Sequence, residues 1–145
     1  YEAPRSRWVA EFVGDVNLFD GEVTSREQNR LIVSTRDGGT LAVAEPRDPV
    51  TKAAVSVAIR PEKVKLSRRG PAVDAMNAHA INRLEGVITD VSYLGGLTVY
   101  KVKLDSGTVL RSSMANTARL DMDAYAAGQR VVAWFTPDDC VVLEQ

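Results

Sequence analysis

Cysteine and histidine are almost absent from this chain of 145 residues, which has only Cys140 and His79. One cysteine excludes an internal disulfide and a multi-cysteine metal site, and one histidine excludes a metal site built from several imidazoles. No base adjoins Cys140 in the sequence, and His79 has no Ser, Cys or carboxylate neighbour. We therefore expect a buried, inert thiol at Cys140, no catalytic residue, no metal site and no enzyme activity.

Long apolar runs and an excess of charge of one sign are also lacking. No run approaches the ~20 residues of a membrane span, and no basic, hydrophobic leader opens the chain. The 18 Lys and Arg balance 19 Asp and Glu, and aromatic residues make up 6%. Nucleic-acid surfaces need a basic stripe, so we expect no nucleic-acid partner, no membrane insertion and a soluble chain of cytoplasmic character. No glycine loop ending in Lys-Ser/Thr is present to bind ATP.

The main feature that is present is an internal repeat. Three landmarks return in the same order, first 65, then 68, then 76 positions later. They are Asn17 to Val23 and Asn82 to Ile88, Gly38 to Leu41 and Ser106 to Val109, and Val57 to Glu62 and Ala133 to Asp138. The growing offset indicates insertions between two diverged copies of one unit.

Each copy has the period-two pattern of five short strands. We expect them at residues 16–25, 30–35, 40–44, 54–60 and 63–67, and at 84–94, 97–105, 108–113, 130–136 and 139–144. Gly95 and Gly96 predict a two-residue hairpin turn that tolerates positive φ at both positions. Five strands in about 70 residues fit an OB-type Greek-key barrel. The predicted fold is all-β, with two OB-like five-stranded barrels that share a core because either alone is marginal.

The predicted division of the chain follows the repeat. It comprises residues 1–14, a segment unlike either copy; 15–67, the first OB-like repeat; 68–81, a linker or crossover; and 82–145, the second repeat.

A short amphipathic helix is predicted from Arg5 to Val13. The signals are Pro4 near its start, the spacing of four between Trp8 and Phe12, and the stop at Gly14. Its apolar side has no obvious partner within so short a segment, so it resembles the end of something longer. Residues 114–128 predict a turn of helix and a loop closed by Gly128.

Arg60 and Glu62, on either side of Pro61, are the most concentrated polar group. They suggest a ligand or partner site, with an arginine fork for an anion. The second copy has Thr136-Pro137-Asp138 at this place, keeping the proline and an acid but losing the arginine. Because the proline turn survives duplication and the arginine does not, we favour a structural turn.

Other candidate residues can likewise be interpreted either as part of a binding site or as structural. Tyr93 stands before the Gly95-Gly96 turn, where it either presents an aromatic ring for recognition or closes a barrel end; we favour the second. Arg68 and Arg69 lie near the inter-repeat connection and suit an anion. Asn17 and Asn82 open the two copies, and we expect each side chain to bond a nearby backbone group.

The opening Tyr1-Glu2-Ala3-Pro4, the following Trp8 to Gly14, and Asn17 together resemble the junction in the ATP-binding subunits of bacterial ABC importers. There the ATPase domain ends and a regulatory region, the transport-associated OB domain of two intertwined barrels, begins. Val57 to Lys63 resembles the hallmark of that region. Tyr93 to Tyr100, with Cys140 to Leu143, is most similar to the polyamine, putrescine-type branch. The resemblance covers the whole chain.

The resemblance implies a regulatory and dimerisation domain of a cytoplasmic ATPase that works as a homodimer under two membrane permease subunits. A periplasmic binding protein would deliver the solute. Residues 1–14 would be the end of the ATPase domain, against which the helix would pack. That domain would hold ATP, Mg²⁺ and every catalytic residue, so we expect no cofactor in this chain.

Two alternatives stay open. The chain can instead be a small-ligand or anion-sensing domain of another importer, for sugar, iron, sulfate or molybdate, a reading motivated by Arg60, Arg68 and Arg69. The third, a generic OB-type oligonucleotide binder, is disfavoured by the balanced charge and the few aromatic residues.

Overall fold

A computed structural model describes residues 16–27, 29–37, 39–46, 50, 52–68, 81–115 and 125–144. These residues form strands and two short 3-10 turns, with no α-helix among them. Two predicted features lie outside this part. One is the helix predicted at 5–13, and the other is the stretch 69–80, which includes Arg69 and His79. Within the described part there is no helix with the length and apolarity of a membrane span.

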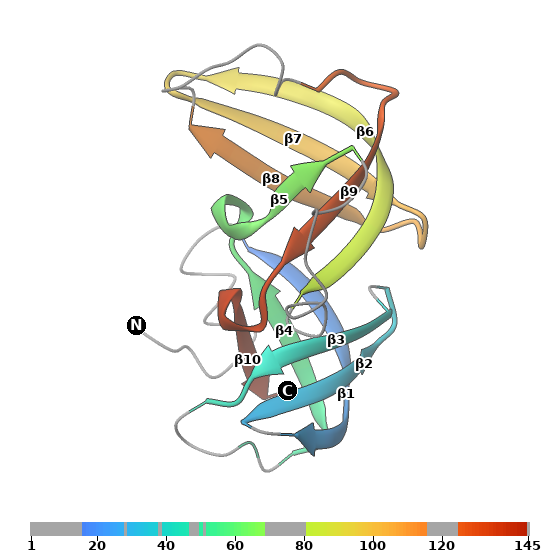
Figure 1. The fold of residues 1–145 in the computed structure, drawn as a ribbon, viewed down its shortest axis with the longest axis vertical. Helices are drawn as coiled ribbons and strands as arrows, with labels where there is room; N and C mark the ends of the chain where they lie inside the picture. The colour runs from blue at the N-terminus through green and yellow to red at the C-terminus, as the bar shows by residue number, and fades with distance from the viewer. Residues whose placement is uncertain are drawn as a thin grey trace.

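The strands form two five-stranded antiparallel sheets, one in each half of the elongated molecule (Figure 1). The first sheet has the order β10–β4–β1–β2–β3 and the second β5–β9–β6–β7–β8. The bounds are β1 Asn17–Glu27, β2 Arg30–Thr35, β3 Gly39–Ala44, β4 Ala54–Ile59, β5 Lys65–Ser67, β6 Asn82–Leu94, β7 Leu97–Leu104, β8 Val109–Ala115, β9 Arg130–Phe135 and β10 Cys140–Glu144. All ten predicted strands are present, and the prediction of an all-β fold of two OB-like units is confirmed.

The two copies exchange their last strands. β5, from the first copy, pairs with β9 in the second sheet, and β10, from the second copy, pairs with β4 in the first. The sheets therefore do not follow the repeat boundaries at 15–67 and 82–145. Each exchange follows a 3-10 turn, η1 (Pro61–Lys63) before β5 and η5 (Pro137–Asp139) before β10. These turns pack against β8 and β3, the third strand of the opposite copy in each case.

One hydrophobic cluster runs through both sheets. It joins Phe19, Val57 and other side chains of the first sheet to Phe135, Leu110 and others of the second. The exchanged strands contribute Leu66 and Val142 to it. The expectation that two marginal units share one core is thus confirmed, and the halves are expected to unfold as one unit.

Glycines shape both long strands. Gly95 and Gly96 make the predicted two-residue turn between β6 and β7, but only Gly95 has a positive φ, 63°. That combination is expected of a turn with glycine at its first central position. Gly21 and Gly86 lie where β1 and β6 pair with neighbours on both sides.

Candidate functional site

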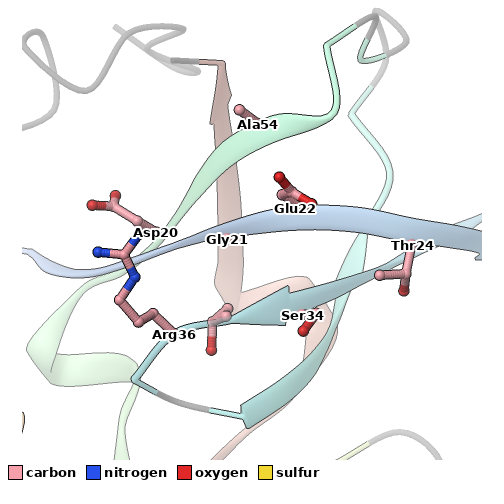
Figure 2. Close-up of a pocket in the computed structure, with 8 residues that line it drawn as sticks. Asp20, Gly21, Glu22, Thr24, Ser34, Arg36 and Ala54 are labelled. Carbon is pink, nitrogen blue, oxygen red and sulfur yellow. The ribbon is translucent and has the colours of Figure 1, made fainter.

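A polar hollow lies along β1 and β2 of the first sheet (Figure 2). Its volume is about 470 Å³. The lining residues are Asp20, Gly21, Glu22, Thr24, Ser34, Thr35, Arg36 and Ala54. Figure 2 shows the Arg36 guanidinium beside the Asp20 carboxylate, while Glu22 lies further along β1 toward Ala54. The hollow is open and lined mainly by polar groups.

Gly21 explains how β2 comes close enough to form this surface. A Cβ at Gly21 would lie 2.3 Å from the carbonyl oxygen of Ser34, which no side chain can occupy. Asp20, the preceding residue, accepts a hydrogen bond of 2.6 Å from the hydroxyl of Ser56 on β4. This hydrogen bond holds one carboxylate of the hollow in place.

The hollow has the chemistry of a binding surface. Two carboxylates and several hydroxyls suit an amine or another polar cation, and the one guanidinium, Arg36, lies beside a carboxylate. The described residues contain no group of His, Cys, Asp and Glu that could hold a metal ion. The lining has no thiol or imidazole.

A second, smaller hollow of about 360 Å³ lies where the copies meet. Its lining includes the turn at Asp37 and Gly39, Arg83 on β6, and Asp105 after β7. Arg130 donates hydrogen bonds to Asp105, at 2.6 Å, and to Glu85, at 3.5 Å. The Asp105 hydrogen bond and charge raise the pKa of Arg130, so this exposed guanidinium keeps its positive charge.

The residues singled out from the sequence lie on separate elements. Arg60 and Glu62 are exposed at the 3-10 turn η1. The Arg68 guanidinium lies over the ring of Tyr125, with Cζ 5.1 Å from its centroid. Tyr93, at the tip of the β6–β7 hairpin, is 73% exposed, which does not fit a ring that closes a barrel end. Arg69 is outside the described residues, and the role of all five stays a prediction.

Cys140 begins β10 with its side chain buried. Burial, and then the nearby charge of Asp139, raises the pKa of the thiol well above its usual range. The expectation of a buried thiol is confirmed, and a protonated thiol is a poor nucleophile.

The sequence contained a signal for the hollow that residue-by-residue reading missed. Both repeated glycines follow an acid, in Asp20-Gly21 and Glu85-Gly86. After the glycine the copies differ, because Glu22 corresponds to Val87. An acid on both sides of the glycine in one copy only was the available indication that this copy presents a polar surface.

Comparison with known proteins identifies the family. The model of the TOBE domain matches residues 57–143. The chain is 33% identical over 144 residues to the putrescine transport ATP-binding protein PotG of Escherichia coli (strain K12), covering 99% of this chain and 37% of that protein. It is 34% identical over 147 residues to the spermidine/putrescine import ATP-binding protein PotA of Trichormus variabilis, covering 100% of this chain and 36% of that protein. The chain thus spans little more than a third of these relatives.

A solved structure has the same fold. The cytoplasmic molybdate-binding protein ModG, with molybdate bound, superposes with a TM-score of 0.73 at 15% identity. The match covers 89% of this chain and 96% of the ModG chain. At this identity the likeness shows the fold alone. Because the family model matches more than half of the residues, including β5 and all but the last residue of β10, the chain belongs to the TOBE domain family.

Proposed function

We propose that this chain is the regulatory and dimerisation part of the ATP-binding subunit of an ABC importer for polyamines such as putrescine or spermidine. The observation that carries the proposal is the alignment of essentially the whole chain with about a third of putrescine and spermidine/putrescine import ATP-binding proteins. ATP and Mg²⁺ would bind to another part of the subunit, and this part would have no enzyme activity. The subunit would work in the cytoplasm, on the inner face of the membrane beneath its permease subunits.

The architecture suits a structural role. Exchange of β5 and β10 locks the two copies together, and one core runs through both. Such a unit transmits a displacement as one body. Pairing of two such units through a two-fold contact would raise the effective concentration of the attached ATPase domains without adding contacts at the ATP site.

Sedimentation of the chain over a wide concentration range tests the dimerisation half of the proposal. We expect a reversible dimer and no ATP hydrolysis; a strict monomer at high concentration contradicts dimerisation.

Uptake of labelled putrescine tests the transport half, in cells whose full-length subunit either retains or lacks residues 16–145. Loss of uptake without loss of the subunit is expected, and unchanged uptake contradicts a regulatory role.

The second candidate function is sensing of a small ligand. The hollow along β1 and β2 favours it, and its carboxylates, Asp20 and Glu22, favour an amine over an oxyanion. ModG, which has the same fold, is a molybdate-binding protein, so the test also includes oxyanions. Calorimetry with putrescine, spermidine, molybdate, sulfate and phosphate decides between them, and silence from all five contradicts sensing.

A further inference from the structure

The far end of β6 is an open edge of the second sheet. On one side β6 pairs with β9 from Asn82 to Val87, and Ile88 then exchanges hydrogen bonds with Gly128 and Gln129. On the other side β7 pairs with β6 as far as Leu94, at the hairpin turn. Among the described residues, no strand lies beside β6 beyond Ile88 on the side away from β7. Figure 1 shows this end of β6 at the upper margin of the second sheet.

The hydrogen-bonding pattern of β6 follows from a contact at the opposite edge of the sheet. The Asn17 side chain bonds both backbone groups of Arg111 on β8, so these groups point away from β7. Lys101 lies opposite Arg111, and its backbone groups therefore point toward β6, because bonded and non-bonded pairs alternate across antiparallel strands. Asp90, opposite Lys101, is thus hydrogen-bonded to β7.

Val91 and Tyr93 consequently present their backbone N–H and C=O groups to the open edge. They alternate along β6 with residues that bond β7, and the two-residue turn agrees, because Leu94 and Leu97 flank it as a bonded pair. Within the described part of the chain, neither Val91 nor Tyr93 makes a backbone bond on that side. An unpaired row of such groups is a template for a further strand.

Apolar side chains lie on both faces of this edge. Tyr93 is 73% exposed, Leu94 59% and Leu97 43%. Tyr93 lies on one face of the hairpin and the two leucines lie on the other, because Leu94 pairs with Leu97 and successive side chains alternate. Asp90 is the only charge in residues 90–97. A strand added at the edge would therefore cover apolar side chains on both faces without meeting a row of like charges.

The corresponding edge of the first copy is protected by charge. Arg26 takes the place of Val91, because each follows the same register shift in its strand. The Arg26 guanidinium bonds the Glu45 carboxylate at 3.1 Å, and charged side chains are a common device against pairing at a sheet edge. β1 also ends at Glu27, the equivalent of Ser92, so β6 carries an apolar end that β1 lacks.

We propose that this edge of β6 pairs antiparallel with the same edge of a second copy, forming a two-fold dimer. The inference rests on the dimerisation in the proposed function and names the surface that makes it. A second copy fits because an antiparallel copy of the strand carries its own unpaired groups in the matching places, so one contact satisfies both edges. The near-neutral edge does not repel its twin.

One register satisfies every unpaired group. Val91 of each copy faces Tyr93 of the other, which gives two residue pairs with two hydrogen bonds each. A shift by two residues in either direction would place one of them opposite Thr89, at the register shift, or Gly95, in the turn. In the favoured register Ser92 lies opposite itself on the two-fold axis, in a pair without hydrogen bonds.

The contact is small. A standard interface has about 20 to 30 residues a side and about ten direct hydrogen bonds, whereas this one has three exposed apolar side chains a side and the bonds of the two residue pairs. We therefore expect a reversible dimer with a Kd of about 10 µM to 1 mM for the chain alone. Attachment to the paired ATPase domains would raise the effective concentration into the same range, so a weak contact is enough.

A proline on the edge tests the pairing. Tyr93→Pro removes an N–H that faces away from β7, so the β6–β7 ladder keeps its bonds while the dimer loses one bond from each copy. Sedimentation of the full 145-residue chain up to millimolar concentration is expected to show a Kd raised about tenfold, with an unchanged circular dichroism spectrum. Val109→Pro is the matched control, because Val109 begins β8, is 51% exposed and pairs with Lys103, at the end of β7 away from the hairpin turn. Its Kd should equal that of the parent.

A cysteine at the two-fold axis tests the register. Residues of a non-hydrogen-bonded antiparallel pair have Cα atoms about 4.5 Å apart, within the span of a disulfide. With diamide as oxidant, two Ser92→Cys thiols are expected to lose their hydrogens to the diamide and form one disulfide between copies. Asp90→Cys, on the same face of β6, is the matched control. It would face Leu94 of the other copy, about 13 Å from its twin, and should cross-link about tenfold more slowly. Cys140 is buried and takes no part.

The outcomes separate this inference from the proposed function. A parent dimer that Tyr93→Pro leaves unchanged, or cross-linking of Ser92→Cys no faster than that of Asp90→Cys, overturns the edge pairing while dimerisation stands. A strict monomer at millimolar concentration overturns both. Hydrogen exchange of the Val91 and Tyr93 amides that slows only in the full-length subunit would assign the edge to another part of that subunit, and overturns the proposal. If Tyr93→Pro unfolds the chain, the two cysteine variants decide alone.

Discussion

The side-chain amide of Asn17 donates a hydrogen bond to the backbone carbonyl of Arg111 and accepts one from the backbone N–H of the same residue, both at 2.9 Å. Asn82 makes the same pair of bonds with Ala42, again at 2.9 Å. Asn17 and Arg111 belong to different sheets, and so do Asn82 and Ala42. The repeated asparagines are therefore reciprocal clamps between the copies.

Replacing either clamp should destabilise the whole chain. Asn17→Ala or Asn82→Ala leaves one backbone N–H and one carbonyl without a partner at a buried junction. We expect a loss of about 2 to 3 kcal/mol in the free energy of unfolding, measured by urea denaturation. Asn29→Gly is the control, because Asn29 is exposed with a φ of 68° that glycine adopts readily. Equal effects of all three substitutions would argue against the clamp.

The repeated glycines should tolerate no side chain. A Cβ at Gly21 or Gly86 would lie 2.3 Å from Ser34 O or 2.5 Å from Lys103 O, so the strands must separate. We expect Gly21→Ala and Gly86→Ala each to cost about 2 to 3 kcal/mol in urea denaturation. Gly96→Ala has open space around its Cβ and should be within about 1 kcal/mol of the parent. A Gly21→Ala protein as stable as the parent would contradict the close approach of β1 and β2 at this position.

Cys140 should make the chain less stable in alkali. Burial raises the pKa of its thiol in the folded chain, whereas the unfolded thiol loses its proton above about pH 8.5. Above that pH the unfolded chain holds fewer protons than the folded chain, so the free energy of unfolding falls as pH rises. Between pH 8.5 and 10 we expect a loss of up to about 2 kcal/mol that Cys140→Ala abolishes. Identical pH profiles for the two proteins would refute this.

The turn at Arg60 can be stabilised with the residues of the other copy. At η5, the N–H and the hydroxyl of Thr136 donate to Asp139 Oδ2 at 2.9 and 3.0 Å, whereas Arg60 makes no such cap at η1. Arg60→Thr with Lys63→Asp should install the cap and add about 1 kcal/mol in thermal or urea denaturation.

The same double variant tests the two readings of Arg60. If the turn is structural, putrescine uptake by the full-length subunit is unchanged, and Arg60→Thr alone is neutral for both stability and uptake. A stable double variant that loses uptake would instead assign Arg60 to a ligand or a partner.

Local patterns predicted the elements well. The alternation at Val55, Val57 and Ile59 marked β4, and the Gly95-Gly96 pair marked the β6–β7 turn. Both signals depend on residues only a few positions apart, so they can be recognised from the sequence. The partners of Asn17 and Asn82 could not be predicted in this way. We expected nearby backbone groups, but the bonds reach 94 and 40 residues along the chain.

The candidate site was predicted less well than the fold. Arg60 and Glu62 were predicted as a candidate site because they lie close together in the sequence, on either side of Pro61. The hollow instead combines Asp20 and Glu22 of β1 with Arg36, which follows β2, and the pairing of the two strands decides that they share one face.

By itself, the sequence determined two copies of a five-strand unit, their turns, and the buried thiol at Cys140, because period-two burial and glycine or proline turns depend on near neighbours. The tertiary structure alone decided that β5 and β10 change places between the two sheets. The last strand of each copy follows the same proline turn and turns one apolar side chain, Leu66 or Val142, into the main core. Backbone hydrogen bonds do not depend on the side chain, so these local patterns do not say which sheet each strand joins, and packing across the whole molecule selects the exchanged pairing.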